Sequence, residues 1–220
     1  MLAKDLSTDA VIPVLTSDTA SYALKLMEDQ KISHLPIVNN LEFLGLISEN
    51  DIYVQNMPEE VIGNHKLSLN NAFVYQHQHI LEVISIVTEL TLSVIPVIDT
   101  KNRYLGSITL QHLLEQFSQT ASLQNPGGII IVERNQNDFS LEEIARIVEA
   151  NDAKILSSYV SSYRDSMKLE VTLKINKMNI LPILQTFERY NYIVLASFTE
   201  SEYNNDLQDR YDSLMNFLNI

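Results

Sequence analysis

The 220-residue chain contains no cysteine and only five glycines. Without cysteine no disulfide can form, which is typical of a protein of the cytoplasm. Phosphate-cradling loops need closely spaced glycines, and the sequence has no Gly-x-x-x-x-Gly-Lys-Ser/Thr, Gly-x-Gly-x-x-Gly, Gly-x-Ser-x-Gly or His-Glu-x-x-His motif. We therefore predict a cytoplasmic protein without enzymatic activity.

The chain also lacks positive charge, because 15 Lys and Arg stand against 28 Asp and Glu, giving a net charge of −13. Nucleic acids and anionic membrane surfaces bind clustered Lys and Arg, so the sequence predicts neither as a partner. Its apolar runs are far shorter than the about 20 residues of a spanning helix. Residues 1–6 have no cationic region followed by an apolar stretch, so we expect no signal peptide.

A pattern of two short apolar segments occurs twice. The first copy consists of residues 32–38 and 43–52, and the second of residues 92–98 and 104–113. Each copy predicts an apolar strand containing Pro, a polar turn, a second strand containing Gly, and a Ser or Thr that can cap a helix. One copy has two short strands and cannot close a core by itself, so we expect the copies to pack against each other.

A helix is predicted before each copy. Ala20, Ala23, Leu24 and Met27 have the spacing of a helix with one buried face. Residues 80–90, before the second copy, are apolar on more than one face. We therefore expect this second helix to be buried on two sides.

The segment Gln-Asn-Pro-Gly-Gly at residues 124–128 predicts a domain boundary. Beyond it the periodicity predicts strand, helix, strand, strand, helix and strand, which is the split βαβ, ferredoxin-like order. The first of these helices should bury Leu141, Ile144, Ala145 and Val148. The third strand, residues 168–175, alternates strictly and should bury Leu169, Val171, Leu173 and Ile175.

These patterns predict four parts of the chain: the first repeat at 1–60, the second at 61–122, the ferredoxin-like domain at 128–199 and an amphipathic helix at 200–220. The last helix would carry Leu207, Tyr211, Leu214, Met215 and Leu218 on one face. We expect this helix to pack on its own chain or on a second copy. A docking helix for another protein is the alternative.

The paired signature, apolar-x-x-apolar-Pro-Val followed by Gly-x-apolar-Ser/Thr-x-x-Asp, resembles a tandem pair of CBS domains, also called a Bateman module. The C-terminal part resembles an ACT domain, and the whole layout resembles the acetoin-utilisation regulator type of protein. The resemblance implies an α/β (α+β) fold, a tandem CBS-domain pair followed by a ferredoxin-like βαββαβ domain. The loop at residues 135–139 lacks the glycine that is usual in ACT ligand loops, which argues against amino-acid binding.

The resemblance also implies a ligand cleft between the repeats. In CBS pairs the Asp of Ser/Thr-x-x-Asp accepts hydrogen bonds from both ribose hydroxyls of an adenine nucleotide, the Ser or Thr reaches toward phosphate, and the backbone before the Pro faces the base. Carried over to the first copy, this assigns an adenosine-type site to Ser33, His34, Leu35, Pro36, Ser48 and Asp51. The alternative is that Ser48 and Asp51 only cap the following helix.

In the second copy the corresponding residues are Val94, Ile95, Thr109 and His112. His112 stands where the ribose carboxylate should be, and its loss costs about one to two decades of affinity. This second cleft is therefore expected to be degenerate. In the first copy Glu49 follows Ser48 where a cation would help to hold phosphate, so we expect a nucleoside or a monophosphate such as AMP rather than a triphosphate.

Histidines offer an alternative kind of site. His77, His79 and His112 could approach one another in this fold, and neutral imidazole both binds metals and titrates near neutrality. No Cys and no nearby carboxylate at ligand spacing accompanies them. We expect polar residues at the rim of a cleft and no metal site.

Two functions remain open. Retention of Ser48 and Asp51 favours a ligand-sensing regulatory module that acts on another, unidentified protein. His112 and the glycine-free loop favour an interaction scaffold whose clefts are degenerate. In either case we predict a homodimer, and the apolar helix at residues 80–90 fits its interface.

Overall fold

The computed structural model describes residues 1–163 and 166–199. The helix expected at 200–220 lies outside this range. The chain divides into two compact units, Met1–Phe117 and Ser118–Ile220, each with its own core.

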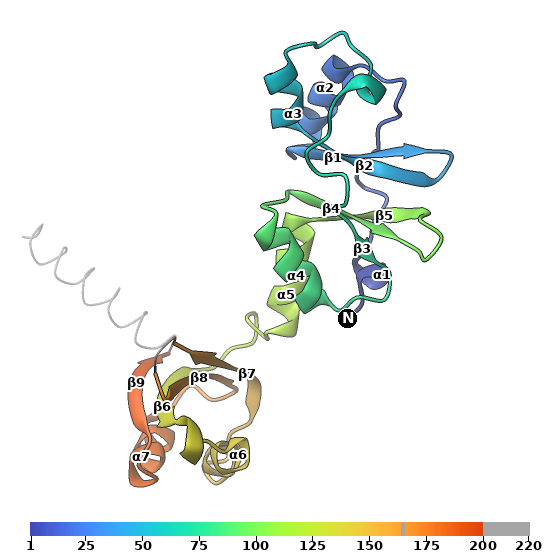
Figure 1. The fold of residues 1–220 in the computed structure, drawn as a ribbon. Helices are drawn as coiled ribbons and strands as arrows, with labels where there is room; N and C mark the ends of the chain where they lie inside the picture. Colours follow the sequence, from blue (N-terminus) through green and yellow to red (C-terminus); the bar gives the residue numbers. More distant parts are fainter. Residues whose placement is uncertain (164–165, 200–220) are drawn as a thin grey trace, which may run out of the picture. The chain divides into compact units, whose positions relative to one another are not determined.

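The first unit contains both sequence repeats (Figure 1). The first copy forms a hairpin of β1 (His34–Asn39) and β2 (Glu42–Ser48), and the second a hairpin of β4 (Val94–Ile98) and β5 (Tyr104–Thr109). The remaining elements of this unit are α1 (Ala3–Leu6), α2 (Ala20–Gln30), α3 (Glu49–Gln55), η1 (Ile62–Asn64), β3 (Val74–Tyr75), α4 (Ile80–Glu89) and α5 (Leu110–Thr120), the last running past the unit boundary.

The two copies agree in detail, which confirms the predicted repeat. Val14 bridges Ile37 in parallel, as Val74 of β3 pairs in parallel with Val97. Each antiparallel hairpin also has a register shift at the matching position, after Ile37 and after Val97. The expected order of strand, turn, strand and helix is therefore present in both copies.

The cores show why one copy is not enough. Leu46, from the first repeat, lies in the cluster formed mainly by the second repeat. Val94, from the second repeat, lies in the cluster formed mainly by the first. Because each core takes a fully buried side chain from the other repeat, the two copies fold as one unit.

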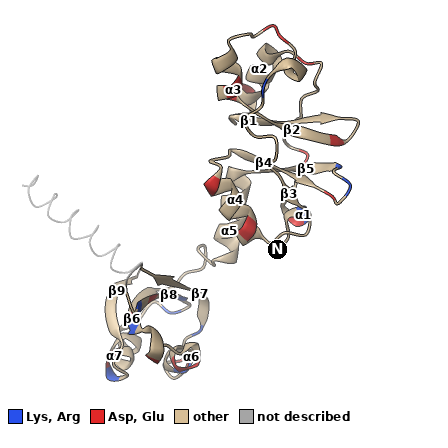
Figure 2. Ribbon diagram, in the orientation of Figure 1, with Lys and Arg blue, Asp and Glu red and all other residues tan. Residues whose placement is uncertain are grey.

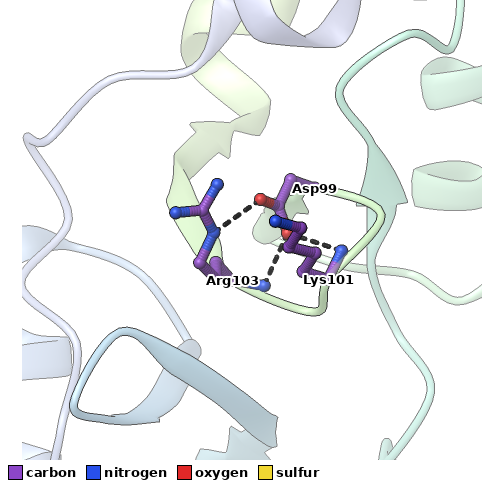
Figure 3. Close-up of polar contacts among 3 residues, drawn as sticks. All are labelled: Asp99, Lys101 and Arg103. Carbon is purple, nitrogen blue, oxygen red and sulfur yellow. Dashed lines mark hydrogen bonds and ion pairs between the residues drawn. The ribbon is translucent and has the colours of Figure 1, made fainter.

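The β4–β5 turn is held by Asp99 (Figure 3). Its Oδ1 accepts the backbone N–H groups of Lys101 at 2.8 Å and Arg103 at 2.9 Å, and its Oδ2 accepts Arg103 Nε at 2.7 Å. These contacts lower the pKa of Asp99, and the backbone N–H of Arg103 has the largest effect. The turn also contacts the first repeat, because Asn102 Nδ2 donates to the Phe43 carbonyl.

The second unit is ferredoxin-like, as expected from the order of its elements. Its strands are β6 (Ile129–Asn135), β7 (Ile155–Ser162), β8 (Lys168–Ile175) and β9 (Ile193–Phe198), and its helices are η2 (Gln136–Asp138), α6 (Leu141–Glu149) and α7 (Leu181–Arg189). They form an antiparallel sheet in the order β7-β8-β6-β9. Val171, Leu173 and Ile175 of β8 are fully buried and Leu169 half-buried, so the predicted alternation is confirmed.

Two predicted helix faces were wrong in part. On α4 Ile80, Val83 and Val87 are buried, but Leu81 is 59% exposed, so this helix is buried on one side and not on two within the chain. On α6 Ile147 is buried in the core whereas Leu141, in the first turn, is 53% exposed.

The arrangement of charged and apolar residues in the structure is the one that the composition predicts. Figure 2 shows the Lys and Arg residues of the described part scattered rather than gathered in a stripe. Among residues 1–163 and 166–199, no helix combines the length and the apolar character needed to cross a bilayer.

Candidate ligand site

A cavity of about 540 Å³ lies where the first cleft is expected. It is bordered by the start of β1, by the N-terminus of α3, by the segment between η1 and β3, and by the residue after α4. The lining residues are Ser33, His34, Ser48, Glu49, Asn50, Tyr53, Ser68, Leu69 and Leu90. The structure therefore brings three of the predicted residues, Ser33, His34 and Ser48, to one cavity, whereas the side chains of Leu35 and Pro36 are buried.

Ser48 and Asp51 form a capping box at the start of α3. Ser48 Oγ accepts the backbone N–H of Asp51, and Asp51 Oδ2 accepts the backbone N–H of Ser48, both at 3.0 Å. Each residue is 7% exposed. Capping is thus confirmed, and a role in ligand binding stays a prediction.

Asp51 does not line the 540 Å³ cavity. It borders a neighbouring cavity of about 380 Å³ together with Asn50, Val54, Gln55, Lys66, Leu67 and Ser68. Asn50 and Ser68 border both cavities, so the carboxylate lies close to the cleft without facing its main volume. Its second oxygen, Oδ1, has no hydrogen bond to any residue that the structure describes.

His34 connects the two repeats at the cleft. Its Nδ1 lies 3.1 Å from Ser33 Oγ and 3.0 Å from Ser93 Oγ, and it accepts the backbone N–H of Ser93 at 3.3 Å. Burial lowers the pKa of His34, and the negative charge of Asp51 opposes this effect. His34 is therefore a neutral hydrogen-bonding group at pH 7.

Two lysines near the cleft were missed by the sequence analysis. A cavity of about 740 Å³ shares Ser33, Glu49 and Tyr53 with the first and is also lined by Lys25 and Lys31. The prediction that no cation lies near Ser48 rested on its neighbours in the sequence, and it did not include lysines that folding brings close to the cleft. Glu28 and Glu49 border the same cavity, so its lining has two charges of each sign.

The second cleft differs from the first. Val94 and Ile95 are buried, and Thr109 Oγ1 accepts the backbone N–H of His112 at 3.1 Å at the start of α5. His112 Nδ1 lies 3.8 Å from Glu115 Oε2. A nearby cavity of about 390 Å³ is lined by Ser33, Val87, Thr88, Thr91, Leu92, Ser93 and Leu110, and neither Thr109 nor His112 borders it.

His77 and His79 have local roles. His79 Nδ1 accepts the backbone N–H of Leu81 at the start of α4, and the ring of His77 stacks on Tyr75 with centroids 5.7 Å apart. Within the described part of the chain, no three His, Cys, Asp or Glu side chains are grouped so that they could hold a metal ion.

In the second unit the glycine-free loop forms the short helix η2. At the end of the preceding strand, Arg134 lies over the ring of Tyr192, 4.6 Å from its centroid. Tyr192 Oη donates to Glu143 Oε2 at 2.8 Å, and burial raises the pKa of Tyr192 to about 12. These three residues are far apart in the sequence, so no spacing pattern indicates the cluster.

Residues 3–54 and 67–119 match the family model described as CBS domain. These two matches cover the two structural repeats, and the N-terminal part of the chain is a tandem pair of CBS domains, a regulatory module. This pair is followed by the ferredoxin-like domain.

Three known proteins illustrate the similarity. Inosine-5'-monophosphate dehydrogenase of Methanocaldococcus jannaschii is 25% identical over 143 residues, which are 64% of this chain and only 28% of that relative. The crystal structure of a CBS domain pair/ACT domain protein from Thermotoga maritima is 22% identical with a TM-score of 0.49, covering 54% of this chain and 98% of that one. A putative acetoin utilization protein from Vibrio cholerae is 22% identical with a TM-score of 0.48, covering 56% and 95%.

Proposed function

We propose that this chain is a non-enzymatic, ligand-sensing regulator whose first CBS cleft binds an adenine nucleoside or nucleoside monophosphate. The observation that carries the proposal is the 540 Å³ cavity, which joins Ser33, His34 and Ser48 of the first repeat to Leu90 of the second. Its volume is within the range of small-molecule sites, about 300–1,000 Å³. A ligand held there would touch both repeats and could change their arrangement.

Asp51 is the proposed ribose acceptor. One of its oxygens caps α3, and Oδ1 has no partner among the described residues. Asp51 can therefore accept a hydroxyl hydrogen bond without giving up its structural role. A shift of side chains around Asn50 and Ser68, which border both cavities, would bring the ribose within reach.

We further propose that the chain signals as a homodimer and that its C-terminal ferredoxin-like domain is of the ACT type. Leu110, Leu114 and Phe117 form an exposed apolar stripe on α5, and Leu81 is exposed on α4. A second copy packed on these helices would cover them. A change in the arrangement of the repeats on ligand binding would then alter the dimer interface.

An interaction scaffold is the second candidate. It is favoured by the capping box, which already uses Ser48 Oγ and Asp51 Oδ2 and so explains both residues without any ligand. Calorimetric titration of the full chain with adenosine, AMP and ATP distinguishes the two functions. The sensor hypothesis predicts binding of adenosine or AMP together with a raised melting temperature. Binding of none of the three compounds would favour the scaffold.

A further inference from the structure

His34 breaks the symmetry of the repeat at the point where the two copies meet. Ser33 and Ser93 are corresponding residues of the two copies, and the Ser33 backbone N–H donates to Ser93 Oγ at 2.9 Å. The residue after Ser33 is His34, whereas the residue after Ser93 is Val94. The first cleft therefore has an imidazole at a position where the second has an aliphatic side chain.

The hydrogen bonds of His34 fix the position of its proton. The backbone N–H of Ser93 is only a donor, so His34 Nδ1, which lies 3.3 Å from it, must be an acceptor. Ser93 Oγ receives the Ser33 N–H, and its own hydrogen is free to point at Nδ1, 3.0 Å away. In a neutral imidazole with an unprotonated Nδ1, the proton is on Nε2.

This Nε2–H group is a donor that no described residue uses. His34 borders the 540 Å³ cavity, and Nε2 has no hydrogen-bond partner among the residues that the structure describes. A donor that is fixed in direction and left unpaired in a binding cavity selects for ligands with an acceptor at that point.

We propose that His34 is a specificity-determining residue: Ser93 of the second repeat holds it as the Nε2–H tautomer, and it donates to a ring nitrogen of the adenine base. This inference rests on the proposed function for its ligand. It adds to that function a reason for the base to bind in the first cleft rather than the second, since Val94 cannot donate. It also couples the base to the contact between the repeats.

The tautomer can be tested on the free protein. Long-range ¹H–¹⁵N correlation spectra of the full chain distinguish the two neutral forms of each histidine, and His34→Asn identifies the resonances of this residue. We expect the Nε2–H form for His34 at pH 7. Finding the Nδ1–H form or an imidazolium would overturn the inference, whatever the ligand.

Two variants test the donor itself. In His34→Asn the Oδ1 atom can still accept the Ser93 N–H, but no donor remains at the ε position; in His34→Gln the amide nitrogen restores a donor there. For adenosine we expect calorimetry to show affinity lowered about three- to ten-fold in His34→Asn, the effect of one neutral hydrogen bond, and lowered less in His34→Gln. Melting temperatures near that of the unchanged protein would show that both variants fold.

Adenosine analogues with carbon in place of one ring nitrogen complete the test. Among 1-deaza-, 3-deaza- and 7-deazaadenosine, one should bind the unchanged protein more weakly than adenosine does, but bind His34→Asn as well as adenosine does. Equal losses for all three analogues in both proteins would overturn the donor role. If no adenine compound binds at all, the proposed function and the ligand role of His34 both fail, while the tautomer spectrum still decides how Ser93 holds the ring.

Discussion

Asp99 uses both carboxylate oxygens to hold the β4–β5 turn, whereas Asp51 uses one and leaves the other unpaired among the described residues. The hydrogen-bond acceptors of an aspartate can therefore both be used by its own turn, as in Asp99, or one of them can remain available to a ligand, as in Asp51. Hydrogen bonds to a carboxylate favour its charged form, and the pKa of Asp99 is accordingly lowered.

Changing Asp99→Asn should lower the stability of the protein at neutral pH by removing the charge from these contacts. Because the pKa of Asp99 is lower in the folded protein than its ordinary value, its stabilising effect is complete above the ordinary value and is lost as the pH falls through the lowered one. Urea unfolding at several pH values should show that the difference in free energy of unfolding between the unchanged protein and Asp99→Asn becomes smaller below about pH 4. Glu59→Gln, at an exposed residue between α3 and η1, is the control. An Asp99→Asn effect that does not change with pH would contradict the charge explanation.

For single residues, the sequence predicts only those contacts that join residues close together in the chain. The Ser48-x-x-Asp51 spacing correctly predicts a helix cap, because both partners lie within one turn. The lysines beside the cleft were not predicted, because Lys25 and Lys31 reach it through the packing of α2 rather than through proximity in the sequence. The hydrogen bonds between His34 and Ser93 likewise depend on how the two repeats cross.

The helices α3 and α5 are corresponding elements with unequal starts. Ser48 and Asp51 satisfy each other's backbone N–H groups, whereas at α5 Thr109 accepts the N–H of His112 and the histidine points instead toward Glu115. The second helix therefore has only half of the capping arrangement of the first.

Changing His112→Asp should complete this arrangement and raise the free energy of unfolding by about 0.5–1 kcal/mol. It should also create or improve binding of adenosine in the second cleft, since a carboxylate would stand at the ribose position. Urea unfolding and calorimetry measure the two effects separately. The reciprocal change Asp51→His is the matched control and should lower both stability and binding; a His112→Asp variant that is less stable than the unchanged protein would contradict the cap.

The periodicity of the sequence predicted the type of each element. It did not always predict which face of the element is buried. The strict alternation of β8 predicts its buried face because one side of the sheet packs on the core. On α4 the sequence shows two apolar faces, and only the structure shows that one of them, with Leu81, is left exposed within the chain. An apolar pattern does not reveal whether it is covered by its own chain or by another.

The proposed homodimer gives these exposed side chains a partner. Leu114 is 61% exposed in the middle of the α5 stripe, so Leu114→Glu should place a charge in the interface and convert the dimer to a monomer at micromolar concentration. Light scattering after size-exclusion chromatography measures the mass. The matched control is Leu141→Glu, at an exposed leucine of α6 that is 53% exposed; a Leu114→Glu protein with the mass of the unchanged dimer would rule out this surface, and a monomeric unchanged protein would rule out the dimer.

At the scale of the whole molecule, the tandem architecture was predictable because the repeat is visible in the sequence and each copy is too small to fold alone. Leu46 of the first repeat lies in the core formed mainly by the second, and Val94 of the second lies in the core formed mainly by the first. Each core is therefore incomplete without the other repeat. The difference between the clefts was predicted from one residue, His112 at the position of Asp51. The contacts of His34 with Ser93 were not predicted, because they join residues of different repeats.

Calorimetry with adenosine and Asp51→Asn tests the central claim, that one cleft per chain binds an adenine ligand. An asparagine oxygen can still accept the Ser48 N–H and cap α3, so this variant removes the charge while keeping the fold. We predict one site per chain in the unchanged protein and an affinity at least about ten-fold lower in Asp51→Asn, as expected for a lost charge-assisted hydrogen bond. Two equal sites per chain, or binding that is indifferent to Asp51→Asn, would contradict this account.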